Sequence, residues 1–475
     1  MHNFYFSNNI NTKWFIFFGL ILHVLASYFT VGYYNADEHY QVIGPLEKLL
    51  NIENKLTWEF DYKIRPWLQP YFYLAITKSL SLLHLNNPFV IAFLLRLVSS
   101  LIGLASIIYL YNHVKHKFNI DNNFSKIIIY TFWFYAFLHA RTSSENLSIS
   151  MLIFGIIFFD KFTSKDELKN KYLLSLLSGT FLGLSMIFRY QVVTSVFFIF
   201  LWVLFNRFNF QNFKLVIFNS GIIIIILFLG LIFDYFGYGF FNNTYYQYYH
   251  ANFVSKWFES FGNDPWWYHF KLFIENFFPP INIIILISIV FFWFKEYKSI
   301  FTFITLPVVI ILSLLSHKEL RFLFPVLIFS PFYISYFFSN SSLFYSKKFL
   351  MNISVIFNIL FFIILFIPAT EQVKVYEFLY YNKNSDNKVL YYDSNPYIID
   401  DLEPKLYTSQ LPKIKKYKVR NEINNSFLIV RNFNSYQEID KLNNCKLVYS
   451  VYPEFVNLNK NWRDRDFNWY IFECK

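Results

Sequence analysis

Long apolar runs separated by short polar stretches follow one another along most of the 475-residue chain. Runs such as GIIIIILFLGLIF (221–233) are continuously apolar and lack the alternation of membrane β-strands. A helix needs about 20 mostly apolar residues to cross a bilayer. The pattern therefore predicts an all-α polytopic membrane protein with about 11 transmembrane helices. The expected spans are residues 14–34, 87–111, 126–139, 146–160, 172–188, 191–206, 215–233, 280–294, 299–315, 322–338 and 349–368.

The short loops between alternate spans are rich in lysine and arginine. If the N-terminus is cytosolic, every cytosolic loop is basic, as the positive-inside rule requires. An odd number of spans then places the C-terminus outside, together with two long loops at about 35–86 and 234–279. The basic residues are Lys115, Lys117, Lys126, Lys161, Lys165, Lys169, Lys171, Arg207, Lys214, Lys295, Lys298, Lys347 and Lys348.

The residues after the last apolar run are more hydrophilic. Short apolar stretches such as KVLYYDS (388–394) and SFLIVRNF (426–433) are separated by Asn, Pro and Asp, which is typical of short strands and helices joined by turns. We predict a transmembrane domain over 1–369 and a small exoplasmic α/β domain over 370–475. Cys445 and Cys474 lie in the second domain, where they either form a disulfide or remain two free thiols.

Composition supports the membrane assignment and narrows the partners. The chain is 55% hydrophobic and only 15% charged, whereas soluble domains carry about 25% charged residues. Its net charge of +11 is explained by the basic loops, so membrane lipids are expected partners and nucleic acid is not. No spacing of Cys and His indicates a metal site, and no cofactor is predicted.

Polar and ionisable side chains collect at the ends of the runs that this orientation places outside. Such groups are costly in or beside a membrane span and by default mark a functional site. Because the segments fall on one predicted face, we expect them to serve one site. They are NADEHYQ (35–41), TWEFDYKIRP (57–66), HARTSSEN (139–146), FRYQ (188–191), FDYFGYG (233–239), FGNDPWWYH (261–269) and SHKELRFLFP (316–325).

Asp37 and Glu38 place two adjacent carboxylates directly after the first apolar run. Neighbouring acids repel each other, which raises the pKa of one of them and provides a general base near neutral pH. The alternative interpretation is a solvated loop start without a catalytic role.

The segment SHKELR gathers cations beside a predicted span. His317 and Arg321 lie four residues apart and would share a face if the segment were helical. Together with Lys318 they would form an anion site, with phosphate as the preferred anion and arginine as its bidentate partner. Glu319 is placed to hold one of these cations. The alternative is a set of anchors that extend to the membrane interface.

Three further arginines, Arg65, Arg141 and Arg189, lie at the outer edge against the positive-inside trend, which indicates a shared anionic ligand. Aromatic residues gather in PWWYH (265–269), which includes Trp266. Interface anchoring is one interpretation of this run, and contact with a sugar or a lipid tail is the other.

In this order the segments resemble glycosyltransferase family 22, the lipid-linked mannosyltransferases of the GT-C fold, which include the GPI mannosyltransferases. The resemblance spans about 35–325 and departs from the family pattern at SSEN (143–146), RYQ (189–191) and WWYH (266–269). It rests on DEHYQ, LTWEFDYKIRPWLQP, ARTSSEN, FDYFGYGF, FGNDPWWYHF and SHKELRFLFPV.

The resemblance implies a GT-C fold and an inverting glycosyltransferase that needs no metal or other cofactor. The enzyme would move a sugar, with mannose preferred, from a polyprenyl- or dolichyl-phosphate donor to a glycan or glycolipid acceptor at the exoplasmic or lumenal face. Asp37 would be the base, and Glu38 would orient it or bind the acceptor. The donor phosphate would be bound by His317, Lys318, Arg321 and Arg65. The substrate-binding candidates are His39, Glu59, Arg141, Asn146, Asp234 and Trp266.

Two other functions stay open at this point. One is a GT-C transferase that accepts a different polyprenyl-phosphate sugar, such as an aminoarabinose or glucose type. A polytopic lipid or glycan transporter is the non-enzymatic alternative, although transporters often carry internal repeats and mid-membrane polar sites, neither of which is visible here. As a multi-pass protein the chain would reside in a bacterial inner membrane or in the endoplasmic reticulum membrane.

Overall fold

The computed structural model describes residues 10–53, 55–164, 170–276, 279–341, 347–382, 388–399, 403–417, 425–442, 444–460 and 468–474. The chain forms two compact units. The first comprises Met1–Ser27, Leu56–Tyr73 and Leu95–Phe366, and the second comprises Tyr28–Lys55, Leu74–Leu94 and Ile367–Lys475. The second unit therefore joins the C-terminal residues with two segments from the N-terminal part of the chain.

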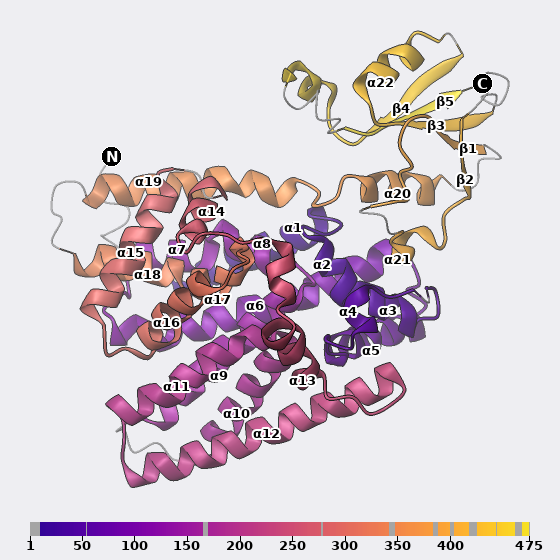
Figure 1. The fold of residues 1–475 in the computed structure, drawn as a ribbon. Helices are drawn as coiled ribbons and strands as arrows, with labels where there is room; N and C mark the ends of the chain where they lie inside the picture. Colours follow the sequence, from indigo (N-terminus) through magenta and orange to yellow (C-terminus); the bar gives the residue numbers. More distant parts are fainter. Residues whose placement is uncertain are drawn as a thin grey trace. The chain divides into compact units, whose positions relative to one another are not determined.

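The first unit is built from helices, as the apolar runs predict (Figure 1). Three helices contribute residues to both units, namely α1 (Thr12–Phe29), α5 (Leu68–Leu82) and α6 (Pro88–Lys117). The others of the first unit are α4 (Trp58–Asp61), α7 (Asn123–Thr131), α8 (Trp133–His139), α9 (Ser144–Phe162), α10 (Lys171–Phe188), η2 (Tyr190–Val192), α11 (Val193–Asn206), α12 (Phe210–Tyr238), α13 (Thr244–Tyr249), η3 (His250–Val254), η4 (Trp257–Phe261), α14 (Tyr268–Asn276), α15 (Ile281–Lys295), α16 (Ile300–Leu314), η5 (Leu320–Leu323), α17 (Phe324–Leu327), α18 (Ser330–Asn340), α19 (Lys347–Leu360) and η6 (Phe361–Phe366).

Helix α10 packs against both α9 and α12 through small residues. Ser175, Gly179 and Gly183 are buried at intervals of four residues, so they line one face of α10. A Cβ atom at Gly179 would lie 2.8 Å from the carbonyl oxygen of Asn219 in α12. Small side chains allow membrane helices to approach this closely, because packing rather than burial from water holds them together.

Several of the predicted spans are interrupted. The run 126–139 is divided at Phe132, whose backbone is extended, into α7 and α8. Asn358 stabilises this break, because its side chain accepts a hydrogen bond from Trp133 N and donates one to Thr131 O. The run 322–338 is divided as well, because η5–α17 meets α18 at 49°. Helices α15 and α16, which correspond to two separate predicted runs, meet at 120°.

Because of these breaks, fewer helices have the length of a complete span. Among the described residues, five helices are long and apolar enough to cross a membrane, or up to seven if each bent pair is one span. The prediction of a polytopic, mostly helical membrane protein is thus confirmed, whereas the number of about 11 transmembrane helices is not.

The second unit contains the N-terminal elements α2 (Ala36–Glu38), η1 (His39–Ile43) and α3 (Gly44–Leu49). It also contains a small sheet near the C-terminus, in agreement with the predicted α/β character. The strand order is β2-β1-β3-β5-β4, with β1, β2 and β3 parallel and β5 antiparallel to both β3 and β4. Its elements are α20 (Gln372–Tyr381), β1 (Lys388–Tyr391), α21 (Lys405–Thr408), β2 (Ile414–Lys416), β3 (Ser426–Val430), α22 (Phe433–Asp440), β4 (Cys445–Ser450), η8 (Glu454–Leu458) and β5 (Tyr470–Cys474).

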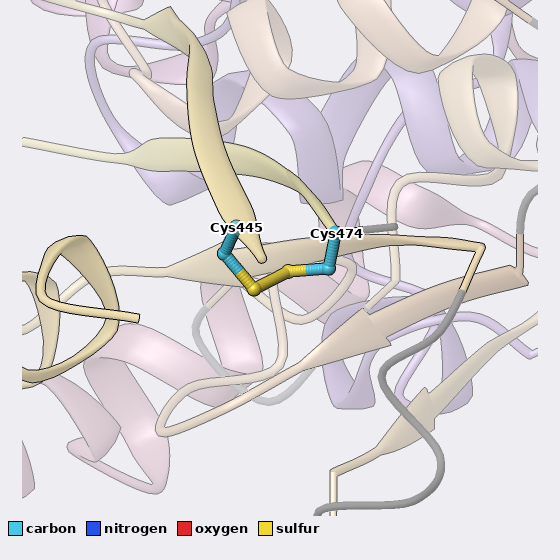
Figure 2. Close-up of a disulfide and its surroundings, with 2 residues drawn as sticks. All are labelled: Cys445 and Cys474. Atoms are coloured by element: carbon cyan, nitrogen blue, oxygen red, sulfur yellow. A yellow bond between two sulfur atoms is a disulfide. The ribbon is translucent and has the colours of Figure 1, made fainter. Parts of the chain in front are cut away.

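A disulfide joins the last two strands of this sheet. Cys445 opens β4, Cys474 ends β5, and the two residues face each other in the antiparallel register. Figure 2 shows the bond between their sulfur atoms. Of the two alternatives left by the sequence, the structure therefore has the disulfide. Such bonds persist in oxidising compartments, and the exoplasmic position of this domain stays a prediction.

Candidate active site

The segment NADEHYQ begins a helix in the second unit. The side chain of Asn35 caps α2 by accepting a hydrogen bond from Asp37 N at 3.0 Å. An asparagine cap followed by acids in the first turn is a favourable helix start, because the carboxylates lie near the positive end of the helix dipole. Asp37 is partly exposed and accepts a hydrogen bond from the Gln41 side chain at 2.7 Å. Glu38 is only 3% exposed and accepts one from Tyr34 N. Asp37 is thus the acid that solvent or substrate can reach.

A buried acid and a buried imidazole lie behind this helix start. His39 Nε2 is 3.9 Å from Glu47 Oε2, and Glu47 is 1% exposed. Burial raises the pKa of Glu47 to about 8, although a hydrogen bond from Leu406 N opposes the shift. Burial also lowers the pKa of His39 to about 4. Near neutral pH both groups are therefore uncharged, and the pair is not a salt bridge. We refer to residues 35–47 as the acid segment.

C-terminal residues of the second unit hold the chain just before the acid segment by hydrogen bonds. The Thr370 hydroxyl accepts a hydrogen bond from Tyr33 N and donates one to Tyr33 O, each at 2.9 Å. Ala369 N and Thr370 N both donate to Val31 O. Gly32 has a φ of 87°, and a Cβ there would lie 2.5 Å from Thr370 Cβ, so glycine is required at this approach.

In the first unit, two guanidinium groups converge on one buried carboxylate. Glu145 is the second residue of α9, and its Oε1 lies 3.1 Å from Arg189 Nη2 and 3.8 Å from Arg321 Nη1. Arg65 also acts electrostatically on Glu145. The Ser143 cap and the α9 dipole favour a negative charge at this position.

Two further acids complete this group. Glu59 of α4 pairs with Arg65. Glu319 binds Arg321 through both oxygens, with contacts of 2.5 Å to Nε and 2.9 Å to Nη2. We call Arg65, Arg189 and Arg321 with Glu59, Glu145 and Glu319 the arginine cluster. Burial alone would raise the pKa of Glu319, but the hydrogen bond and charge of Arg321 outweigh it, and the pKa is lowered.

His317 joins the cluster by a different route from the one predicted. The segment 316–319 is not helical, so His317 and Arg321 do not share a helical face. Glu319 has an extended backbone and brings them together, because its Oε1 is 3.0 Å from His317 Nε2 as well as bonded to Arg321. A shared face would have required a helix over 317–321, but α16 ends at Leu314 and η5 begins only at Leu320.

Lys318 is turned toward backbone carbonyls. Its Nζ donates to Asp264 O at 2.9 Å and to Leu315 O, and the residue is 4% exposed. Its backbone N donates to the Asp264 side chain, and Asp264 N donates to Ser316 O. Lys318 therefore joins the loop around Asp264 to the loop after α16.

The remaining predicted binding residues mostly support the backbone around the cluster. Both carboxylate oxygens of Asp234 accept hydrogen bonds, from Trp67 N at 2.8 Å and from the Thr244 hydroxyl at 2.5 Å. Asn146 donates to the carbonyls of His139 and Arg141, at 2.7 Å each.

Two of the predicted substrate-binding residues have contrasting exposure. Arg141 is 2% exposed, and its guanidinium lies over the Phe137 ring. Trp266 is 66% exposed. The structure thus brings Glu59, Arg65, His317 and Arg321 together, while Arg141, Asn146, Asp234 and Lys318 make the separate contacts given above.

Sequence reasoning did not assign roles to Glu145 and Glu47. The sequence does contain a signal for Glu145, because two serines that can cap a helix precede it and an apolar run follows it. This pattern indicates an acid in the first turn of a helix. Glu47 had a weaker signal, because it stands beside Lys48 in the mostly apolar stretch GPLEKLL. Among the described residues, no group of three or more His, Cys, Asp or Glu side chains is arranged to hold a metal ion.

Comparison of the sequence with known families matches residues 14–393 to the Alg9-like mannosyltransferase family. GPI alpha-1,2-mannosyltransferase 3 of Bos taurus is 23% identical over 339 residues, which are 68% of this chain and 59% of that protein. GPI mannosyltransferase 3 of Debaryomyces hansenii is 22% identical over 390 residues, 77% of this chain and 66% of that protein. The human GPI alpha-1,2-mannosyltransferase 3 is 23% identical, and the match covers 56% of it. The chain thus matches under two thirds of the length of these relatives.

Comparison of the structure with solved structures supports the same conclusion about the fold. ArnT from Cupriavidus metallidurans bound to undecaprenyl phosphate has a TM-score of 0.57, with 97% of this chain and 98% of ArnT covered at 8% sequence identity. Its apo form has a TM-score of 0.51. The fold is therefore of the GT-C type that ArnT has, with a small C-terminal sheet. With the family match covering most of its length, the chain belongs to the Alg9-like mannosyltransferase family.

Proposed function

We propose that this protein is an inverting mannosyltransferase of the exoplasmic or lumenal membrane face. It takes mannose from a polyprenyl- or dolichyl-phosphate donor and transfers it to a glycan or glycolipid acceptor. The observation that carries the proposal is the arginine cluster, in which Arg189 and Arg321 lie beside the buried carboxylate of Glu145 and Arg65 acts on it electrostatically. Family membership favours a transferase over a transporter, and a protein of the same fold has been solved with a polyprenyl phosphate.

The arginine cluster suits the phosphate of the donor. A guanidinium has more N–H donors than one carboxylate can accept, so Arg321 can bond Glu319 and still donate to a phosphate oxygen. The acids fix the orientation of the guanidinium groups before the donor arrives. Charge that develops on the leaving phosphate is then met by donors that need not reorganise, which is the main source of catalysis in such sites.

Asp37 acts as the general base. Its carboxylate takes the proton from an acceptor hydroxyl as that oxygen forms a bond to the anomeric carbon. The bond from the anomeric carbon to the phosphate oxygen breaks on the opposite face, and its electron pair stays with the departing polyprenyl phosphate. The configuration at the anomeric carbon is therefore inverted. Glu38, which is buried beside Tyr34 N, keeps the helix start and hence Asp37 in place.

The proposal is tested with the full-length protein in nanodiscs. Dolichyl-phosphate mannose and undecaprenyl-phosphate mannose, each carrying a radioactive sugar, are supplied with a lipid extract as the source of acceptor. The wild type should transfer label to a glycan or glycolipid, and Asp37→Asn should abolish transfer while donor binding remains. Asp440→Asn, an exposed acid in α22, is the control and should be fully active. Near-normal transfer by a folded Asp37→Asn protein would defeat the assignment of the base.

A further inference from the structure

Four aromatic side chains form an exposed surface near the arginine cluster in the first unit. They come from two segments, Trp58 and Tyr62 from α4 and its end, and Trp257 and Phe261 from η4. Trp58 is 43% exposed, Tyr62 is 55% exposed and Phe261 is 57% exposed. We call these four residues the aromatic shelf.

The rings of the aromatic shelf contact one another. The Trp58 and Phe261 rings are stacked with centroids 6.1 Å apart, and Trp58 also meets Trp257 at 5.5 Å. Tyr62 stands edge-on to Trp257 at 4.3 Å. Mutual support of this kind fixes the orientation of large side chains that are nevertheless open to solvent, as a preformed binding surface requires.

The aromatic shelf is continuous with the arginine cluster. The Phe261 ring lies 5.8 Å from the His317 ring, and His317 bonds Glu319 of the cluster. On the other side, Trp58 is followed directly by Glu59, which pairs with Arg65. A ligand that lies on the shelf would therefore be next to whatever anion the cluster holds.

Exposed polar residues adjoin the shelf residues in the chain. They are Asp61, Asn263 and the ion pair of Lys256 with Glu259. A pyranose ring offers C–H groups on one face and hydroxyl groups around its edge, so it is satisfied by aromatic faces with carboxylates and amides at their rim. A purely lipid-facing surface would not place four charged or amide side chains among its aromatic residues.

We propose that the aromatic shelf is a subsite that binds a sugar residue of the acceptor. This inference deepens the proposed function and rests on it, because the sugar is an acceptor only if the arginine cluster holds a donor. The chemical class of ligand is a mannose-containing glycan, whose ring faces Trp58 and Phe261 and whose hydroxyl groups reach Asp61 and Glu259.

The test measures sugar binding without requiring turnover. Saturation-transfer NMR with α-1,2-mannobiose is applied to the full-length protein in nanodiscs, for the wild type, Trp58→Ala and Trp58→Phe. Trp14→Ala is the matched control, because Trp14 of α1 is 60% exposed and has no part in the shelf. Mannobiose should receive saturation from the wild type, Trp14→Ala and Trp58→Phe, and the effect should be lost in Trp58→Ala. Equal saturation from Trp58→Ala would overturn the subsite.

Transfer kinetics and co-flotation with vesicles distinguish a sugar subsite from a membrane anchor. In the transfer assay, Trp58→Ala should raise the acceptor KM about tenfold, an expected size for losing one aromatic contact, while the donor KM is unchanged. If Trp58→Ala instead weakens only co-flotation with phosphatidylcholine vesicles, the shelf is a membrane anchor and the proposal is wrong. If the wild type transfers no sugar but still binds mannobiose through Trp58, the proposed function fails and the sugar site stands.

Discussion

The acid segment and the arginine cluster differ in the charge state of their buried side chains. Behind Asp37, the buried pair in the acid segment is neutral, because burial keeps Glu47 protonated and His39 unprotonated. The arginine cluster consists of charges paired side chain to side chain, such as Arg189 with Glu145. Departure of a phosphate needs fixed positive charge. The two regions thus differ in charge, because the buried pair behind Asp37 is neutral whereas the arginine cluster holds fixed positive charge beside its acids.

Of the changes within the arginine cluster, Arg321→Ala should lower the transfer rate most. Arg321 is bonded to Glu319 and lies near Glu145, so its loss removes donors for the leaving phosphate and leaves both acids without that partner. The transfer rate should fall by about 100- to 1000-fold, the usual cost of removing one preorganised donor. Initial rates with varied donor and acceptor measure it, and donor use should suffer more than acceptor use. Equal kinetic effects on both substrates would argue against the phosphate role.

Glu145→Gln should weaken the fold more than the chemistry. Two guanidinium groups, those of Arg189 and Arg321, would lose their common buried acid. Breaking a buried ion pair by removing one partner costs about 3–5 kcal/mol. The apparent unfolding midpoint in detergent, followed by fluorescence, should fall by several degrees.

Glu377→Gln is the matched control for this variant. Glu377 pairs with Lys374 on the partly exposed side of α20 at 2.8 Å. Because solvent-accessible pairs contribute only about 0–1 kcal/mol, its midpoint should hardly change. If Glu145→Gln were as stable as Glu377→Gln, Glu145 would not organise the arginines.

The same contrast explains what the sequence could predict. The acid segment is contiguous, so Asp37, Glu38 and His39 are visible as one motif, and the apolar runs reveal a helical membrane protein. The roles of Glu145 and Glu47 depend on partners far along the chain, Arg321 in one case and Leu406 in the other. No local pattern encodes such pairings. The sequence groups His317 with Arg321 through a helical spacing, whereas the structure groups them through the extended backbone and carboxylate of Glu319.

The breaks within the apolar runs were also beyond local reasoning. Hydropathy identifies an apolar run but not a break within it. The division at Phe132 depends on Asn358, a distant residue whose side chain satisfies the exposed backbone groups on both sides of the break. A polar side chain in the later run 349–368 is therefore what shortens the earlier run 126–139.

Glu47→Gln should have almost no effect on stability near pH 4.5 and an effect that grows as the pH rises toward 8. Because the pKa of Glu47 is raised to about 8 in the folded protein, glutamine imitates the form already present at pH 6. The ordinary pKa of this carboxyl is 4.5, so between pH 4.5 and 8 the unfolded chain has lost a proton that the folded protein keeps. Stability of the wild type therefore falls through this window as pH rises. The amide introduced by the substitution would carry no charge at any pH, so the unfolding midpoint of the variant should exceed that of the wild type increasingly from pH 5 to pH 8. Parallel pH profiles for the two proteins would show that Glu47 is ionised at neutral pH, and that the acid segment is supported by charge, as the arginine cluster is.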